Sequence, residues 1–444
     1  MSGPPRPDRP GGSAPRLRPT ARGWALLLTG LLAAGTAPAL GQRDLLRVGV
    51  LLTALSVFAA LVAHRSSRTL DLVSRSTPGL VEAGASAPVR LTVLGRGRAA
   101  GRVVLEDAVP LALGGTARVA VPRLADGETL ELQHTVGSDV RGSYRVGPAT
   151  VRARDPFGLV VASRTVGEAT ALDVLPRVHR LADVPLGDLG GSRGPSVGTA
   201  AATSPDDAAI RTYRVGDDLR RVHWRSTARR GEVMVRADEH PGRPDAVLLL
   251  DDRAGAHHGR GAASSLEWAV SAAASAAVHL HGRGHRVRLL HAGRLQEAPG
   301  TDEASAVRPL LRELARVRPG ADDGLARSLT ALGRSGPAVL VAFLGEVDEA
   351  DVQPLISARP PGVPALAVLQ RTRLWQSGAT PDEDAPAGAA LRRAHLVLAR
   401  AGWRTAVATP ATGVAQAWAS AARGTPAPSA PPAPAGATAT GGRP

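Results

Sequence analysis

The chain has 444 residues, enough for two or three domains, and its 54 basic and 39 acidic side chains leave a formal net charge of +15. It contains no lysine, which excludes a Walker A phosphate loop and a lysine Schiff base, and no cysteine, which excludes disulfides and thiolate nucleophiles. Because every one of the 54 basic residues is an arginine, as in chains from GC-rich genomes, the charge is weak evidence for nucleic-acid binding.

Two long apolar runs near the N-terminus predict membrane helices. Residues 1–22 are rich in proline, glycine and arginine, and we expect them to form a disordered basic N-terminus. The runs 24–40 and 45–63 follow, and at 1.5 Å per residue the first covers about 25 Å, close to the hydrocarbon thickness of a thin bilayer. The sequence therefore predicts a transmembrane helical hairpin over residues 23–66.

Arginines on both sides of this hairpin predict its orientation. Five arginines precede the first run, while Arg65, Arg68 and Arg75 follow the second, so the positive-inside rule places both flanks in the cytoplasm. We expect a multi-pass protein of the bacterial inner membrane with both termini and the soluble domains in the cytoplasm. The alternative is a cleaved signal peptide, because residues 37–39 read A-P-A after an apolar core. The second run would then stop transfer and leave the remainder cytoplasmic.

The remaining chain divides by its apolar pattern into two predicted domains. Residues 67–178 carry short alternating apolar runs between glycine, proline and aspartate turns, which predicts a β-sandwich-like domain. Residues 243–423 alternate apolar strands with amphipathic helices, which predicts a doubly wound α/β domain with its functional edge at the carboxyl ends of the strands. Residues 424–444 predict a disordered Pro/Ala/Gly tail. The predicted strands of the α/β domain are residues 246–250, 287–290, 339–344, 365–369 and 405–408.

A dense motif lies between these domains, in the segment 179–242. Residues 210–236 read IRTYRVGDDLRRVHWRSTARRGEVMVR and crowd arginines, carboxylates and a tryptophan together. Arginine forks that match nearby carboxylates, with a tryptophan face open to a guanidinium, predict a rigid ionic and stacked network. The residues that carry the motif are Arg211, Tyr213, Gly216, Asp217, Asp218, Arg220, Trp224 and Arg229.

This motif resembles the signature of a bacterial family, domain of unknown function 58, which looks like R-x-Y-x-x-G-D-D-x-R-x-I-x-W-x-x-x-A-R. The chain departs from it at Val222, where isoleucine is usual. Upstream, residues 141–144 (RGSY), 147–148 (GP) and 155–159 (DPFGL) resemble the lead-in of the same family. The resemblance covers roughly residues 65–251, and the hairpin before it is similar in placement.

The resemblance implies a membrane-anchored protein with a β-domain and a von Willebrand factor A-like α/β domain. Relatives are often encoded beside MoxR-type AAA+ ATPases and transglutaminase-like membrane proteins, which implies these partners besides the lipid bilayer. We therefore expect a non-enzymatic scaffold or adaptor that works with a MoxR-type ATPase in assembly or maturation of envelope or other protein complexes. In this role the signature residues bind the partner. The alternative is an arginine-rich nucleic-acid-binding module or an uncharacterised hydrolase.

The loop after the first α/β strand resembles a metal site that has lost its ligands. The von Willebrand factor A fold holds magnesium with a D-x-S-x-S loop, because a hard cation needs several oxygen ligands. Here residues 251–255 read DDRAG, so Arg253 and Gly255 replace both serines. We predict a degenerate metal loop of Asp251, Arg253 and Gly255, in which the Arg253 guanidinium lies near Asp251 as an internal cation.

Other constellations carry less chemistry. A metal site from Asp217, His223, Asp238 and His240 is disfavoured by the surrounding arginines, and no G-x-S-x-G elbow supports a Ser-His-Asp triad. The arginines of the motif could bind nucleic acid, but the neighbouring carboxylates favour a folded ionic network. We expect no catalytic residue, no cofactor, no bound metal and no nucleic-acid partner.

Overall fold

A computed structural model describes most of the chain and divides it into two compact units, Met1–Arg177 with Leu311–Val317, and Val178–Leu310 with Arg318–Pro444. The described residues are 13–97, 102–183, 210–212, 224–236, 244–297, 307–321, 324–332, 337–376 and 386–424.

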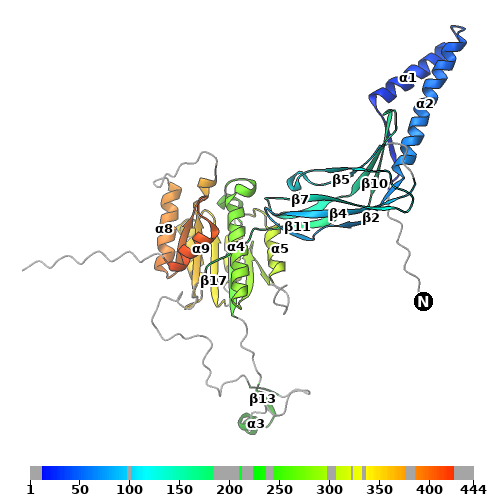
Figure 1. The fold of residues 1–444 in the computed structure, drawn as a ribbon. Coiled ribbons are helices and arrows are strands. Elements are labelled where there is room, and N and C mark those ends of the chain that lie inside the picture. The colour runs from blue at the N-terminus through cyan, green and yellow to red at the C-terminus, as the bar shows by residue number, and fades with distance from the viewer. Residues whose placement is uncertain are drawn as a thin grey trace, which may run out of the picture. The chain divides into compact units, whose positions relative to one another are not determined.

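Two antiparallel helices, α1 (Ala21–Thr36) and α2 (Arg43–Ser67), form a hairpin at the start of the first unit (Figure 1). Within the described residues, α2 alone is long and apolar enough to cross a membrane; only 17% of its most apolar window is buried. The helix α1 has 16 residues and ends before the predicted run does, because Pro38 has no N–H to continue the helical hydrogen bonds.

Two glycines let these helices approach closely. A Cβ on Gly49 would lie 2.5 Å from the backbone nitrogen of Ala34, and one on Gly30 would lie 2.8 Å from Oγ1 of Thr53. Many large apolar side chains of the hairpin are exposed, while Leu26 and Leu55 pack against a small buried core. Those of the hairpin that are exposed are Trp24, Leu28, Leu31, Leu32, Leu40, Leu46, Val48, Val50, Leu51, Val57, Phe58 and Leu61.

The N-terminal segment differs from its prediction. Residues 13–22, expected to be disordered, include the strand β1 (Arg16–Pro19), which pairs antiparallel with β10 (Val160–Val166), and the first residues of α1. All four side chains of β1 are exposed. A strand held by backbone bonds alone leaves no apolar alternation in the sequence, so the pattern could not show it. Residues 1–12 lie outside the described residues.

The rest of the first unit is built from strands around one core (Figure 1). In β4 the alternate residues Val89, Leu91 and Val93 are buried, as a sheet with one covered face requires. Its sheets are β1-β10-β9-β5-β6, β2-β4-β7 and β3-β11-β8. The further elements are β2 Leu70–Ser76, β3 Leu80–Glu82, β4 Ser86–Gly95, β5 Arg102–Asp107, η1 Leu111–Leu113, β6 Ala117–Val121, β7 Thr129–Gly137, β8 Gly142–Val146, β9 Ala149–Arg154 and β11 Thr170–Leu175.

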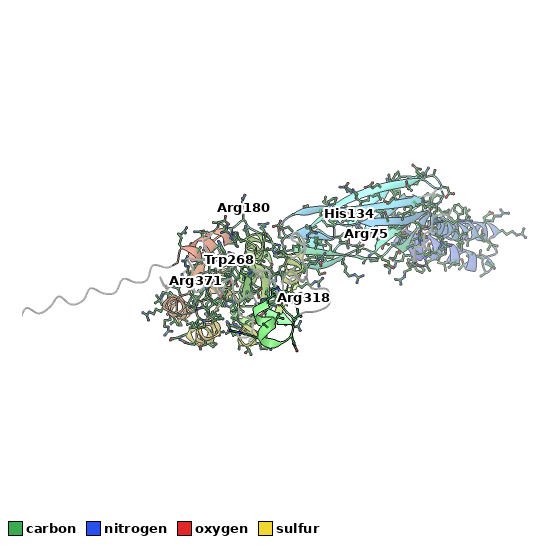
Figure 2. The ribbon with its side chains drawn as sticks, turned by 90° about the horizontal axis from the view of Figure 1, so that it is seen from below. Arg75, His134, Arg180, Trp268, Arg318 and Arg371 are labelled. Atoms are coloured by element: carbon green, nitrogen blue, oxygen red, sulfur yellow. The ribbon has the colours of Figure 1, made fainter. Side chains whose placement is uncertain are left out.

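A buried ionic group also lies among these strands. Asp107 is 2.7 Å from Nη1 of Arg75 and 2.8 Å from Nε2 of His134, and the side chains of Arg75 and Asp107 are 4% and 1% exposed. Figure 2 labels Arg75 and His134 in this part of the chain. Because a buried carboxylate is costly to leave unpaired, removing either partner should destabilise this part of the chain.

The second unit holds a six-stranded sheet in the order β16-β15-β14-β17-β18-β19. Its five predicted strands are confirmed to within one residue at each end, and the antiparallel edge strand β16 was missed. The elements are β14 Asp245–Leu250, η4 Ala254–Ala256, η5 Gly261–Ala263, α4 Ser265–Gly282, β15 Arg286–His291, β16 Arg294–Glu297, α6 Gly324–Leu332, β17 Val339–Leu344, α7 Glu349–Ala358, β18 Ala365–Gln370, η6 Thr372–Trp375, α8 Pro386–Arg400, β19 Arg404–Ala408 and α9 Val414–Arg423. The helix α5 (Arg308–Arg316) begins in this unit, and from Leu311 onward it belongs to the first unit.

Helices cover both faces of this sheet. The helix α4 packs on β14, β15 and β17 and meets α9 (Figure 1), while α6, α7 and α8 join the core on the opposite face. Alternate residues of β14 divide accordingly: Val247 and Leu249 lie in the core with α6, α7 and α8, and Leu248 is buried outside that core. The sheet is thus doubly wound, as the sequence predicts.

Candidate functional site

The loops after β14 and β17 leave the sheet in opposite directions. β14 pairs in parallel with β15 on one side and β17 on the other. The chain continues from β14 to α4 on one face and from β17 to α7 on the other. In open α/β sheets ligands bind at this kind of switch point, beyond the carboxyl ends of the strands. Residues 251–255 follow β14 here.

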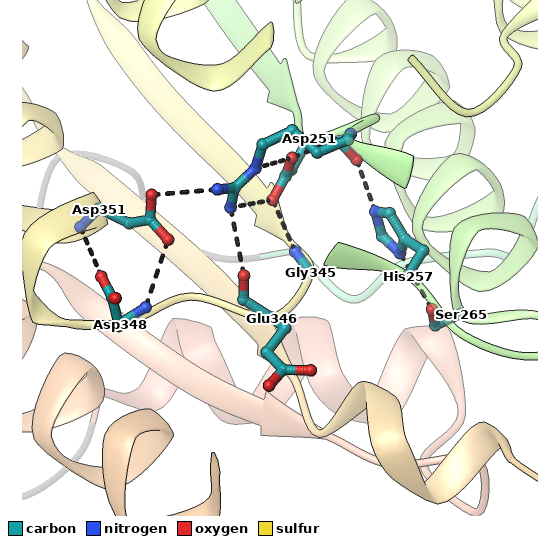
Figure 3. A network of polar contacts seen from close by, with 8 residues as sticks. Asp251, His257, Ser265, Gly345, Glu346, Asp348 and Asp351 are labelled. Carbon is teal, nitrogen blue, oxygen red and sulfur yellow. Dashed lines mark hydrogen bonds and ion pairs between the residues drawn. The ribbon is translucent and has the colours of Figure 1, made fainter. Parts of the chain in front are cut away.

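The Arg253 guanidinium lies at this edge and bonds to two carboxylates (Figure 3). Its Nε and Nη2 each donate to one oxygen of Asp251, both at 2.9 Å, and its Nη1 donates to Asp351 at 3.0 Å. Nη2 also donates to the carbonyl oxygen of Glu346 at 3.2 Å. The expected contact between Arg253 and Asp251 is therefore confirmed. The guanidinium joins the β14 loop to α7, whose first turn holds Asp351.

The ion pair between Arg253 and Asp251 is largely buried. The Asp251 side chain is 0% exposed and that of Arg253 is 13% exposed. Burial by itself lowers the pKa of Arg253, but its hydrogen bonds and charge attraction to Asp251 and Asp351 outweigh burial and raise it. Arg253 therefore stays charged over the whole physiological range and balances Asp251 permanently.

Close packing around Gly345 limits which residues could stand beside Asp251. The backbone nitrogen of Gly345 donates to Oδ2 of Asp251 at 3.2 Å. A Cβ at Gly345 would lie 2.4 Å from the carbonyl oxygen of Ala256. A residue with a side chain at position 345 therefore cannot fit without moving this backbone.

His257 and Ser265 form a contact that resembles part of a catalytic triad. Nδ1 of His257 lies 3.0 Å from Oγ of Ser265, and Nε2 lies 2.7 Å from the carbonyl oxygen of Asp251. Ser265 is fully buried at the start of α4, and its Oγ also accepts the backbone N–H of His258. Burial lowers the pKa of His257. With a buried hydroxyl and a backbone partner in place of a carboxylate, this pair is built to hold the loop.

A second carboxylate of the loop, Asp252, was not singled out from the sequence. It is 3% exposed, and its Oδ2 lies 3.3 Å from Nδ1 of His291 at the end of β15. Its carbonyl oxygen accepts from Gly320 at 2.6 Å. At the rim, Glu346 meets Arg373 at 2.9 Å and His258 at 3.3 Å. Within the described part of the chain, no group of three or more His, Asp or Glu side chains could hold a metal ion.

The signature residues lie apart from this loop in the sequence, and the structure describes only some of them. Arg211 lies in β12 (Ile210–Thr212), which pairs antiparallel with β13 (Met234–Arg236). Trp224 begins the short helix α3 (Trp224–Arg230), which also holds Arg229; the Trp224 side chain is 73% exposed. The other signature residues, Tyr213, Gly216, Asp217, Asp218 and Arg220, lie outside the described residues.

Comparison with known proteins agrees with the motif. Residues 209–352 match the model of a family described as Protein of unknown function DUF58. The chain resembles this family. The match spans both the signature segment and the Arg253 loop, so both candidate regions lie within the matched part of the chain. Among the curated proteins, none matches the chain.

Solved structures give only faint likenesses. The CARDB domain of the PF1109 protein from Pyrococcus furiosus has 18% identity and a TM-score of 0.17, over 24% of this chain and 91% of that one. A β-glucosidase from Listeria innocua has 15% identity and 0.16, over 24% and 16%. The alkylpurine DNA glycosylase AlkC from Pseudomonas fluorescens has 9% and 0.17, over 30% and 39%. Likenesses this low carry no argument.

Proposed function

We propose that the protein is a membrane-anchored, non-enzymatic scaffold or adaptor that works with a MoxR-type AAA+ ATPase in the assembly or maturation of envelope or other protein complexes. It resides in the bacterial inner membrane as a multi-pass protein, and its soluble domains and both termini lie in the cytoplasm. A transglutaminase-like membrane protein is a further proposed partner. The resemblance to the DUF58 family supports both partners.

The observation that carries the non-enzymatic part is the Arg253 clamp. At the switch point of an α/β sheet an enzyme or metal protein keeps its carboxylates open to a ligand. Here the fully buried Asp251 already accepts two hydrogen bonds from the Arg253 guanidinium, one from the Arg253 backbone nitrogen and one from that of Gly345. The edge is therefore suited to holding loops in place for a partner, and we regard the α/β domain as a von Willebrand factor A-like fold with a degenerate metal loop.

The apolar outside of the hairpin supports the membrane part. A soluble protein buries its large apolar side chains, and exposed apolar patches mark interaction sites or membrane contact. On α2, Leu51 is 66% exposed and Phe58 is 55% exposed, and on α1, Leu32 is 69% exposed. The exposed apolar side chains of both helices are suited to contact with lipid chains.

The test is co-production of the full chain, tagged and extracted in detergent, with a MoxR-type AAA+ ATPase from the same organism. We expect a stoichiometric complex that survives purification. Hydrolysis of a substrate, or salt-sensitive RNA binding by the purified chain with no ATPase bound, would replace the proposal by its alternatives.

A further inference from the structure

The turn between β9 and β10 presents an exposed aromatic ring on a rigid frame. Asp155, 3% exposed, accepts the backbone N–H of Phe157 at 2.8 Å and that of Val160 at 2.6 Å. Gly158 has φ +71, a conformation that glycine adopts without strain. The Phe157 side chain, in contrast, is 54% exposed. The Asp155 carboxylate thus bonds to the backbone of its own turn, while the Phe157 ring stays exposed.

This turn is fastened to the first residues of the hairpin. Thr20, the N-cap of α1, donates through Oγ1 to the carbonyl oxygen of Gly158 at 2.9 Å and through its backbone nitrogen to that of Leu159 at 2.8 Å. A Cβ on Gly23 would lie 2.1 Å from the same Leu159 oxygen. Because the backbones touch, the turn has a fixed height along α1, level with its first turn.

The position of the turn along α2 is given by the residues that pack with it. The small buried core that holds Leu159 also contains Ala59 and Ala63 of α2, which precede Arg65 by six and two residues, or about 9 and 3 Å along a helix. Arg65 and Arg22 are the arginines that flank the apolar stretch, and Trp24, 51% exposed, stands one turn into α1. The turn therefore lies at the boundary between the arginines and the apolar part of the hairpin.

We propose that the β9–β10 turn is a membrane-surface anchor, in which Phe157 inserts among lipid chains just inside the headgroups of the same leaflet that Arg22 and Arg65 face. This proposal rests on the membrane location proposed above. Aromatic rings are favoured at this depth, and arginines beside them pair with anionic phosphates. Because the turn belongs to the five-stranded sheet, its insertion would hold that sheet against the bilayer.

The chain has no cysteine, so single cysteines can be placed and spin-labelled in the full-length protein in vesicles containing anionic phospholipid. Phe157→Cys tests the turn, and Pro156→Cys is a second probe in case the first variant does not fold. Phe58→Cys reports on the hairpin. Leu111→Cys is the matched control, because Leu111 is 92% exposed and follows β5, whose last residue pairs with the opposite end of β9.

We expect labels at positions 157 and 58 to collide several-fold more with oxygen than with a water-soluble nickel chelate, and the label at 111 to show the reverse. If the label at 58 lies in lipid while those at 156 and 157 behave like the label at 111, the anchor is wrong and the membrane location stands. If all labels are aqueous, the membrane location itself is wrong.

Discussion

Arg253 holds a buried carboxylate that would otherwise be left without a cation. Arg253→Met keeps the length of the side chain but leaves Asp251 uncompensated, so we expect the free energy of unfolding to fall by about 3–5 kcal/mol. Adding Asp251→Asn should recover part of this loss. Denaturant unfolding of the detergent-solubilised chain measures both.

A second prediction at this loop concerns magnesium. A ligand raises stability only when it binds the folded state, so millimolar Mg²⁺ should leave the unfolding temperature of the wild type unchanged. A saturable, chelator-reversible rise that Asp251→Ala abolishes would mean that the loop still binds metal.

Histidine burial gives the second unit a dependence on pH. Burial is the main cause that lowers the pKa of His257, His279, His285 and His395 below the ordinary 6.5. The unfolded chain therefore takes up protons before the folded one. The free energy of unfolding is therefore highest above about pH 7. It declines as the pH falls through 6.5, the pKa of the unfolded histidines, toward their lower pKa values in the folded state. Thermal unfolding between pH 7.5 and 5 should show this fall, and His257→Gln should reduce it; an unchanged slope in that variant would contradict the assignment.

At the scale of elements, the short helix α3 exposes the one signature aromatic that the structure describes. Trp224→Ala removes a side chain that is 73% exposed, so we expect the free energy of unfolding to change by less than about 0.5 kcal/mol. Co-purification of the ATPase should drop strongly, while the matched variant Leu111→Ala retains it. Loss of stability with unchanged partner binding would show that Trp224 packs in the folded protein and is no contact residue.

The two kinds of strand show what the sequence could and could not reveal. β17 and β18 are buried at every position, because a parallel sheet is covered on both faces, and such strands read as continuous apolar runs. β1 and β16 are short edge strands whose polar side chains stay at least partly exposed. The strand β1 pairs with β10, far along the chain, and no local residue pattern predicts that pairing. The strand β16 pairs with β15 across a turn, but its four residues, RLQE, show no apolar alternation.

The same holds for the candidate site. The contact of Arg253 with Asp251 is local, two residues apart, and could be predicted from the loop alone. Its second carboxylate, Asp351, is 98 residues away, and only the fold brings it there. Asp252 was missed because it stands at a variable position of the metal-loop pattern, and His291 because it lies 39 residues away and only the fold brings it to Asp252.

At the scale of the whole chain, the arginines that flank the hairpin predict its topology. A reporter that is active only outside the cytoplasm should give no signal when fused after Ala63 or at Pro444, and a clear signal when inserted at Gln42, in the turn between the helices. Activity of the fusion at Pro444 would place the large domains outside the cytoplasm and end the proposed partnership with a cytoplasmic ATPase.

The strand β1 makes the hairpin an insertion between two strands of the first unit, which belong to different sheets. The chain pairs with β10 before it enters α1, and it enters β2 directly after α2. A fragment that begins at residue 67 would lose β1 and leave β10 with an open hydrogen-bonding edge. It would also uncover Leu159, Val160 and Ala162, which pack against the helices. Open edges beside apolar surface recruit other chains. Removing the hairpin to gain solubility would therefore produce a fragment that aggregates.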